Sequence, residues 1–540
     1  FSVAKPLGFN IIDDGPRSVI YSAHSQQVGD VDPTDIRADF VLLTTKFYQG
    51  SRHPVPRNAY FTDATEFNEQ WRREVTAKFP GGYTRVKQQI TKLTPYYARV
   101  DSYTHAWTTF FHTRELGPEL VQRLLAVHPE LKEKDGQVEP EKRMMKFRFY
   151  MQAGWYTVAN AELDRLLKDA PQEKERVEQA RKQLRLLMAE ELLTATERAR
   201  AAGQHRLAQQ LLARFPNEEF NEKVALRLAR LRGTYETENA RFRSAQRFLA
   251  ALPGKVGGEE GSFLAEAART ILGELNLDNV ERLETFVTLA EQAERDAGEG
   301  RPVTHAPEQL LAAAVTGWLQ GRNYTETKVE SARRFWDARR FVLDYQRTNL
   351  TVRRRQMAEG YKKAGGSVAY DELAQLIRLL PPPEPGETAS SRATAFAALA
   401  SGLGAGAAEL GPAAAGGALP GAEETMECRT PPVRWHNEGV RYFLRLPPEY
   451  HHGRAYPVLL VLHHANTQRP AEEHAEALLK EIAPHAARHG YILAAPVWTN
   501  RFSPGYEYSA AEHMTVIATL RDLRRHYQVD SDRVFLTGLG

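Results

Sequence analysis

Cysteine is almost absent from this chain of 540 residues, which carries a single one, Cys428. One thiol cannot form an internal disulfide, so the sequence excludes the small secreted scaffolds that disulfides stabilise. Long apolar runs are absent too, because no stretch of about 18 apolar residues occurs, and no transmembrane helix is expected. The compartment stays open, since large proteins outside the cytoplasm often lack disulfides.

An excess of either charge is also missing. The chain has 71 Lys and Arg against 68 Asp and Glu, a balance of +3. This surplus is too small to indicate a nucleic-acid footprint or a polybasic membrane surface. The contents of 42% hydrophobic, 26% charged and 9% aromatic residues are globular values, which exclude wholesale disorder, collagen and coiled coils.

Both ends of the sequence look internal to a longer protein. The chain begins at Phe1 without the charged and apolar regions of a signal peptide, and it ends at Gly540 in a strand-like pattern. We therefore expect a piece of a longer chain, and we assign no compartment from its N-terminus.

A change in composition predicts the domain organisation. Residues 381–424 begin with a Pro-rich stretch and become rich in Ala and Gly, which is typical of a flexible linker. Before it we predict a small mixed element in residues 1–60 and a mainly helical region in residues 61–380. After it, residues 425–540 are predicted to form an α/β domain with a parallel sheet.

The helical region contains a recurring block in which an apolar helix end is stopped by proline. The four blocks end at Pro129, Pro171, Pro216 and Pro253. Residues 146–171 resemble a tetratricopeptide repeat, because Gly154 is followed by Ala159 and then by Pro171. An array of this kind implies a protein partner, whereas an irregular helical bundle is the alternative that the spacing leaves open.

If the blocks are repeats, each is the second helix of a hairpin, and the hairpins stack through one continuous core. The leucines expected in that core are Leu124, Leu167, Leu212 and Leu249. The aromatic residues between Tyr96 and Phe111 are predicted to be the buried face of one helix rather than a ligand-stacking groove.

The C-terminal part alternates apolar runs with helical patterns. Strands are expected at 440–446, 457–463, 491–496 and 533–538, with helices at about 471–489 and 509–527. Ser509, with Glu512 three residues later, is a capping-box pattern at the start of the second helix. Such alternation predicts one sheet in which the last three strands are parallel.

Four segments of this part are similar to the α/β-hydrolase superfamily, in its esterase and peptidase-like branch. They are residues 441–450, 456–463, 490–496 and 529–538, and the resemblance covers about 438–540. It implies the first half of a hydrolase domain that acts on an ester or an amide.

Such hydrolases carry their nucleophile in a G-x-S-x-G turn between a strand and a helix. Gly538 and Leu539 match the first two positions of this nucleophile elbow, but Gly540 stands where the family has serine. The acid and the histidine of the triad normally follow the nucleophile in the chain, so the resemblance places no triad member in this sequence.

The oxyanion region matches the family only in part. Members usually carry His-Gly after the strand that resembles 457–463, whereas this chain has His463, His464 and Ala465. His463 matches and is interpreted as a residue that anchors the loop, and Ala465 is a candidate donor toward a developing oxyanion.

No metal or cofactor is predicted. His485 and His489 are four residues apart, but no glutamate completes an H-E-x-x-H pattern. No phosphate-binding loop occurs, and the glycines of 402–406 follow no strand. Two functions stay open: a serine esterase or peptidase, and a non-catalytic interaction protein with a pseudo-hydrolase domain.

Overall fold

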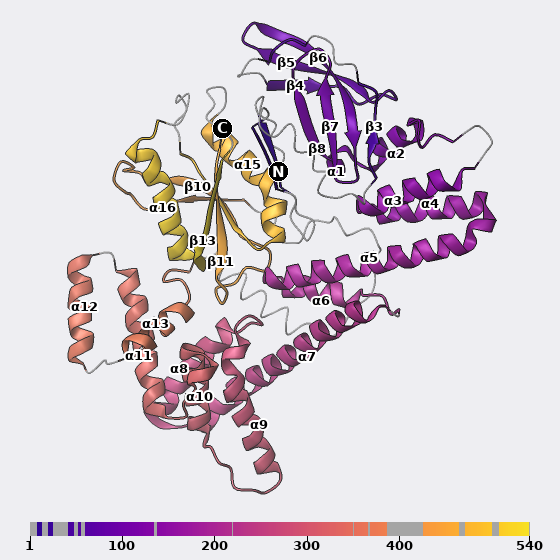
Figure 1. Ribbon diagram of the computed structural model, residues 1–540. Helices are drawn as coiled ribbons and strands as arrows, with labels where there is room; N and C mark the ends of the chain where they lie inside the picture. The colour runs from indigo at the N-terminus through magenta and orange to yellow at the C-terminus, as the bar shows by residue number, and fades with distance from the viewer. Residues whose placement is uncertain are drawn as a thin grey trace. The chain divides into compact units, whose positions relative to one another are not determined.

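The computed structural model describes a chain that is mostly helical, with an antiparallel sheet near its N-terminus and a mixed sheet near its C-terminus (Figure 1). The described residues are 8–12, 20–24, 41–47, 52–55, 60–133, 138–218, 220–348, 350–364, 368–385, 425–463, 470–498 and 507–538. Two compact units divide the chain, Phe1–Glu190 and Glu191–Gly540. We call them the first and the second unit. Their boundary falls inside a helix and not at the predicted linker.

An antiparallel sheet forms the first part of the first unit, where the sequence predicted helices from residue 61. Its strands follow the order β4-β5-β6-β7-β8, and β3 pairs with β6. They are β3 Leu43–Thr44, β4 Tyr60–Ala64, β5 Arg72–Phe79, β6 Gly82–Leu93, β7 Tyr97–Ser102 and β8 Thr108–His112, and a separate hairpin joins β1 Gly8–Ile12 to β2 Ile20–His24. The prediction of helix was wrong here because polar residues fill these strands and hide their alternation.

The aromatic stretch belongs to this sheet and not to a helix. Tyr97 lies on β7 and Phe110 on β8, and their ring centroids are 5.9 Å apart. Both side chains are buried, as is Trp107. The role in core packing is therefore confirmed, whereas the helical placement was wrong.

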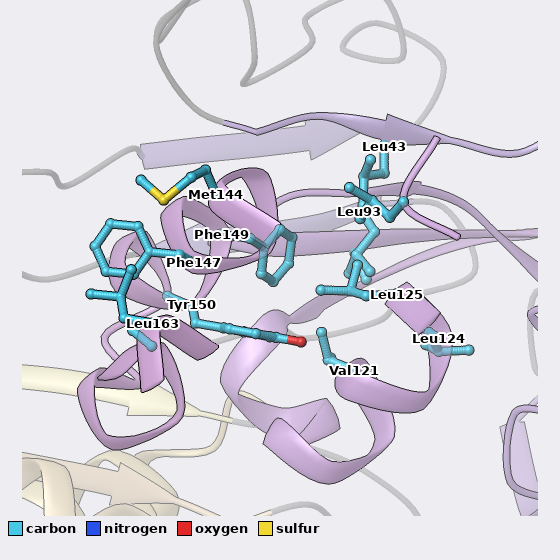
Figure 2. Packing of buried hydrophobic residues seen from close by; sticks show 14 of the residues in the cluster. Leu43, Leu93, Val121, Leu124, Leu125, Met144, Phe147, Phe149, Tyr150 and Leu163 are labelled. Carbon is cyan, nitrogen blue, oxygen red and sulfur yellow. The ribbon is translucent and has the colours of Figure 1, made fainter. Parts of the chain in front are cut away.

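Helices cover one side of the sheet and form the core of the first unit. They are α1 Thr113–Leu116, α2 Pro118–Val127, α3 Pro140–Gln152 and α4 Tyr156–Asp169. Figure 2 shows Leu93 of the sheet directed toward Leu125 of α2, with Phe149 of α3 beside them. The indole of Trp71, which precedes β5, donates to the carbonyl of Leu124 in α2 at 3.0 Å.

A helical hairpin with one turn geometry occurs twice. The α3–α4 turn has Gly154 at φ +76°, and the turn between α5 Lys174–Ala201 and α6 His205–Ala213 has Gly203 at φ +77°. Glycine suits both turns because L side chains avoid this left-handed region. Ala159 and Ala208, five residues after each glycine, are fully buried. The hairpin predicted from Gly154 and Ala159 is thus present and repeated.

The four leucines do not form one continuous stack. Leu124 and Leu167 lie in the core of the first unit, whereas Leu249 lies in a separate core of the second unit. The reason is the length of α7 Glu222–Ala251, which runs for 30 residues and makes the last block the end of a long helix. That part of the repeat prediction was wrong.

Four further helices of the second unit, α8, α9, α11 and α13, pack around α10, whose residues from Leu310 to Gln320 are all buried, and α12 packs against α11. An apolar face on every side is what a central helix requires. The helices are α8 Gly258–Glu274, α9 Glu284–Gly298, α10 Pro307–Gln320, α11 Val329–Arg347, α12 Thr351–Lys363 and α13 Tyr370–Leu379. Short 3-10 turns lie at Pro171–Glu173, Leu252–Lys255, Val280–Leu283 and Arg322–Tyr324.

The C-terminal sheet has the strand order β13-β11-β12-β10-β9. Its strands are β9 Met426–Arg429, β10 Arg441–Arg445, β11 Tyr456–Leu462, β12 Ile492–Pro496 and β13 Val529–Gly538. β11 is parallel to β12 and to β13, while β10 is antiparallel to β12 and to β9. The predicted parallel arrangement of the last three strands is confirmed, within a sheet that is mixed as a whole.

Two helices cover opposite faces of this sheet. α15 Ala471–Arg488 packs against Val461, whereas α16 Ala510–His526 packs against Leu460, the preceding residue of β11. Successive residues of a strand point to opposite faces, so the two helices flank the sheet. The hydroxyl of Ser509 accepts from the amide of Glu512 at 3.2 Å, which confirms the predicted cap.

Helices of the second unit hold the sheet at the amino ends of its parallel strands. Asp278, between α8 and α9, contacts His451 at 2.9 Å and Arg454 at 2.8 Å. Glu449 accepts from the first-turn amides of α6, Arg206 at 2.9 Å and Leu207 at 3.1 Å. We call these contacts the docking seam.

The predicted linker begins at the same edge of the sheet. Glu384 receives a hydrogen bond from Arg525 Nε at 2.5 Å, and its carbonyl oxygen lies 2.7 Å from Nδ1 of His526. Residues 381–385 therefore contact the sheet part, although they were predicted to belong to a flexible linker. Residues 386–424 lie outside the described part of the chain.

Candidate functional site

The carboxyl ends of the parallel strands meet at one edge of the C-terminal sheet. β11 ends at Leu462, β12 at Pro496 and β13 at Gly538. The chain leaves β11 toward α15 on one face and leaves β12 toward α16 on the other face. Neighbouring parallel strands whose connections diverge in this way leave a crevice beyond their carboxyl ends, where α/β sheets bind ligands.

His463 and Trp498 join the two diverging connections. His463 follows β11 and is 1% exposed, and Trp498 follows β12 by two residues. The indole N–H of Trp498 donates to the carbonyl of His463 at 2.9 Å, and the two rings stack at 5.4 Å. This contact fits the predicted role of His463 as an anchor of the loop after β11.

Gly538 lies at the same edge, opposite Leu462 in the pairing of β13 with β11. The structure therefore brings two of the predicted site residues, His463 and Gly538, to the ends of neighbouring strands. His464, Ala465, Leu539 and Gly540 were predicted for the oxyanion region and the elbow, and they lie outside the described residues.

A cavity of about 630 Å³ opens at this edge of the sheet, and no sequence motif predicted it. Pro470 and Ala471 at the start of α15 line one side, and Val497 after β12 lines another. Its charged lining comes from β9, β10, the loop between them and α15, namely Arg429, Arg441, Glu438, Glu472 and Glu473. No local motif marks these residues. They come together because β10 pairs with β12 on one side and with β9 on the other.

Both arginines of this cavity are paired with carboxylates. Arg441 contacts Glu472 and lies 3.7 Å from Glu427, and Arg429 lies 3.7 Å from Glu438. The lining therefore offers both signs of charge to a polar ligand, with neither sign in large excess.

Strong electrostatic perturbations occur at the docking seam. Burial alone would raise the pKa of Asp278, but the hydrogen bonds from His205 and His451 outweigh it and hold the pKa far below its usual range. Burial lowers the pKa of His452 to about 4, with a smaller contribution from His451. These groups lie where the helices hold the sheet, so we interpret them as structural.

The thiol of Cys428 is also not activated as a nucleophile. Burial raises its pKa to about 11, although a hydrogen bond with Tyr442 opposes this. The hydroxyl of Tyr442 donates to Asp522 at 2.7 Å, and burial raises the pKa of Tyr442 as well. A protonated thiol is a poor nucleophile, so these side chains form a buried polar network beneath α16.

The described part of the chain holds no group of three or more His, Cys, Asp and Glu side chains arranged for a metal ion. Among its helices, none combines the length and the apolar character needed to cross a membrane. In comparisons with known proteins, no family model matches the chain, and no curated protein matches it significantly.

Proposed function

We propose that residues 425–540 are the first half of an α/β-hydrolase-type domain of the serine esterase or peptidase branch. The observation that supports this most is that β11 and β12 end at the same edge and continue to helices on opposite faces of the sheet. Hydrolases of this type place an oxyanion donor in the loop after the strand equivalent to β11 and the nucleophile after the strand equivalent to β13. His463 and Gly538 stand at the starts of those two connections.

In this proposal, residues at the carboxyl edge hold the oxyanion loop and the elbow in place. The stacked pair of His463 and Trp498 fixes where the loop after β11 begins, and that loop carries Ala465, the candidate donor. Oxyanion donors act only when they are held in place before charge develops. Gly538 closes β13 with a residue that permits a sharp turn.

The nucleophile is the missing part. Acyl transfer by this mechanism requires a hydroxyl at the elbow, a base that deprotonates it and an acid that orients the base. Gly540 carries no hydroxyl. We therefore propose that this 540-residue chain binds an ester or amide group in the crevice without cleaving it.

Hydrolysis of p-nitrophenyl acetate tests the proposal on two proteins, the 540-residue chain and the product of the whole reading frame. We expect buffer-level rates from the chain. Turnover by the whole product alone, inhibited by a serine-directed fluorophosphonate, would place the active groups beyond residue 540 and would contradict the alignment of Gly540 with the nucleophile. Turnover by the chain itself would contradict the role assigned to Gly540, because another serine would have to be the nucleophile.

The alternative function is a non-catalytic interaction platform, and Gly540 is the observation that favours it. The repeated helical hairpins are also consistent with protein binding. Absence of turnover in both proteins, with each shown to be folded by circular dichroism, would support this alternative over the hydrolase proposal.

A further inference from the structure

α12 is a helix that buries no side chain. It packs beside α11 through Tyr361, whose ring stacks on Phe341 with centroids 4.2 Å apart (Figure 1). Arg354 of α12 also donates to the carbonyl of Thr348 at 2.6 Å, just after α11 ends. A helix of 13 residues is marginal in water without more burial than this.

The face of α12 opposite Tyr361 is basic and partly apolar. Helical periodicity places Val352, Arg355 and Lys363 on it, with Arg353 at its border. All four side chains are exposed, Val352 at 71%. None of these three cations makes an ion pair with any residue that the structure describes, and Leu350 before the helix is 69% exposed.

The charge of this region departs from that of the chain as a whole. Residues 329–363, which span α11 and α12, contain ten Lys or Arg against four Asp or Glu, a balance of +6. The entire chain carries only +3, so the rest of it is net negative. A local excess of one sign on an exposed element attracts a partner of the opposite sign.

We propose that the outer face of α12 binds an acidic protein segment that carries apolar side chains between its carboxylates. The cations would pair with the carboxylates, and Val352 and Leu350 would meet the apolar side chains. Nucleic acid fits less well, because its phosphate backbone offers nothing to two exposed aliphatic residues. Glu359 lies on the same face and lowers the balance of its four charged side chains from +3 to +2. The proposal does not depend on the hydrolase assignment.

The test uses a fluorescein-labelled peptide of three Glu-Glu-Leu-Glu-Glu-Phe repeats and a matched peptide with Gln in place of Glu. Fluorescence anisotropy with the 540-residue chain should show binding of the acidic peptide only. The affinity should fall as salt rises from about 50 to about 300 mM, because exposed charges are screened.

Charge reversal locates the surface. We expect R353E/R355E/K363E to weaken binding at least about tenfold, since the change removes three ion pairs and puts like charges in their place. The control R230E/R232E/R243E reverses three exposed cations on α7 and should keep the affinity within about twofold. If the first variant fails to fold by circular dichroism, R353Q/R355Q/K363Q replaces it.

Three results would overturn the proposal. One is an equal loss of affinity in both triple variants, which would mean general charge attraction. Another is equal binding of the Gln peptide or no binding of the acidic one. The third is preferential binding of a single-stranded RNA of similar length, which would make the partner a nucleic acid.

Discussion

Asp278 gathers three basic side chains although it lies in a short turn between two helices. His205 approaches it at 3.1 Å, on the oxygen that Arg454 also contacts, and His451 contacts the other oxygen. The carboxylate is 13% exposed, so its charge is stabilised almost entirely by these neighbours. Burial of a charge is tolerated only with such compensation.

We expect Asp278→Asn to lower the free energy of unfolding by about 3 kcal/mol, because it leaves buried cations without their counter-charge. Glu294→Gln is the control, since Glu294 and Arg247 pair on the surface with more than half of each side chain exposed. That change should cost less than about 1 kcal/mol. Urea unfolding measures both, and equal losses would contradict the structural role of Asp278.

His452 predicts a pH dependence of stability. Its pKa in the folded chain is about 4, below the ordinary value of 6.5, so the unfolded chain takes up the proton first as pH falls. Stability from this residue is therefore complete above about pH 6.5 and is lost between 6.5 and 4, by as much as about 3 kcal/mol.

Urea unfolding between pH 7.5 and pH 5 tests this dependence in the parent chain and in His452→Gln. The variant should show a flatter decline across the window. Asp278 does not contribute there, because its lowered pKa affects stability only below about pH 4. His526, whose pKa is raised chiefly by its hydrogen bond to Asp522, acts in the opposite direction. An unchanged slope in His452→Gln would contradict the prediction.

At the scale of elements, the turn from α15 to β12 approaches the α5–α6 turn closely. Gly490 has φ +70°, and a Cβ there would lie 2.7 Å from the carbonyl oxygen of Ala202. Gln204 in the α5–α6 turn donates in return to the carbonyl of Ala487, in the last turn of α15. The carbonyl of Ala487 thus accepts two hydrogen bonds, one from Gln204 and one from the amide of Gly490 at 3.1 Å.

We expect Gly490→Ala to destabilise the chain by about 2 kcal/mol, from left-handed backbone strain together with the clash at Ala202. Gly233→Ala is the control, because Gly233 lies within α7 with open space around its Cα. Alanine there should be neutral or stabilising by up to about 1 kcal/mol. Thermal unfolding compares the two, and a Gly490→Ala protein as stable as its parent would show that the turns do not pack as described.

The elements that the sequence predicted correctly are those with an unambiguous local signal. β11 and β12 are continuous apolar runs, and Ser509 with Glu512 marks the start of α16. The sheet of the first unit was missed because Gln88 and Asp101 are buried within its strands. Their hydrogen-bond partners lie on neighbouring strands. Arg73 donates to Gln88 at 2.9 Å, and Thr108 donates to Asp101 at 2.6 Å. Polar burial of this kind depends on tertiary contacts that no periodicity reveals.

The candidate site also contains residues that the sequence predicted and residues that it did not. His463 and Gly538 were predicted from the resemblance to hydrolase motifs at the ends of two strands, whereas Trp498 was missed. Trp498 follows β12 by two residues, and the signal that could have found it is an aromatic directly after a buried strand. The charged cavity had no such signal, because strands from distant parts of the sequence assemble it.

At the scale of the whole molecule, the predicted linker does not separate two independent bodies. Pro383 and Glu384 contact the ends of α11 and α16, since Arg347 donates to the carbonyl of Pro383 at 2.6 Å and Arg525 donates to Glu384. On the other side of the linker, Met426 begins β9, which pairs with β10. Helices and sheet on both sides of residues 386–424 therefore belong to one unit.

Cleavage between residues 386 and 424 tests this organisation. With a specific protease site inserted there, we expect the two fragments to remain associated during gel filtration, because the docking seam joins them. The same cleavage in an Asp278→Asn/Glu449→Gln variant should release more of the C-terminal fragment. Complete separation of the parent fragments would show that the seam is too weak to hold the unit together.

The docking seam also bears on how such a protein can evolve. Glu449 accepts hydrogen bonds from the first amides of α6, and Arg454 donates to the carbonyl of Ala201 at the end of α5. Each partner lies more than 240 positions away in the chain. A recombination that exchanged the helices for those of another protein would leave Glu449 and Arg454 without their hydrogen-bond partners. The helices and the sheet are therefore expected to be inherited as a pair, even though a long Ala/Gly-rich stretch lies between their sequences.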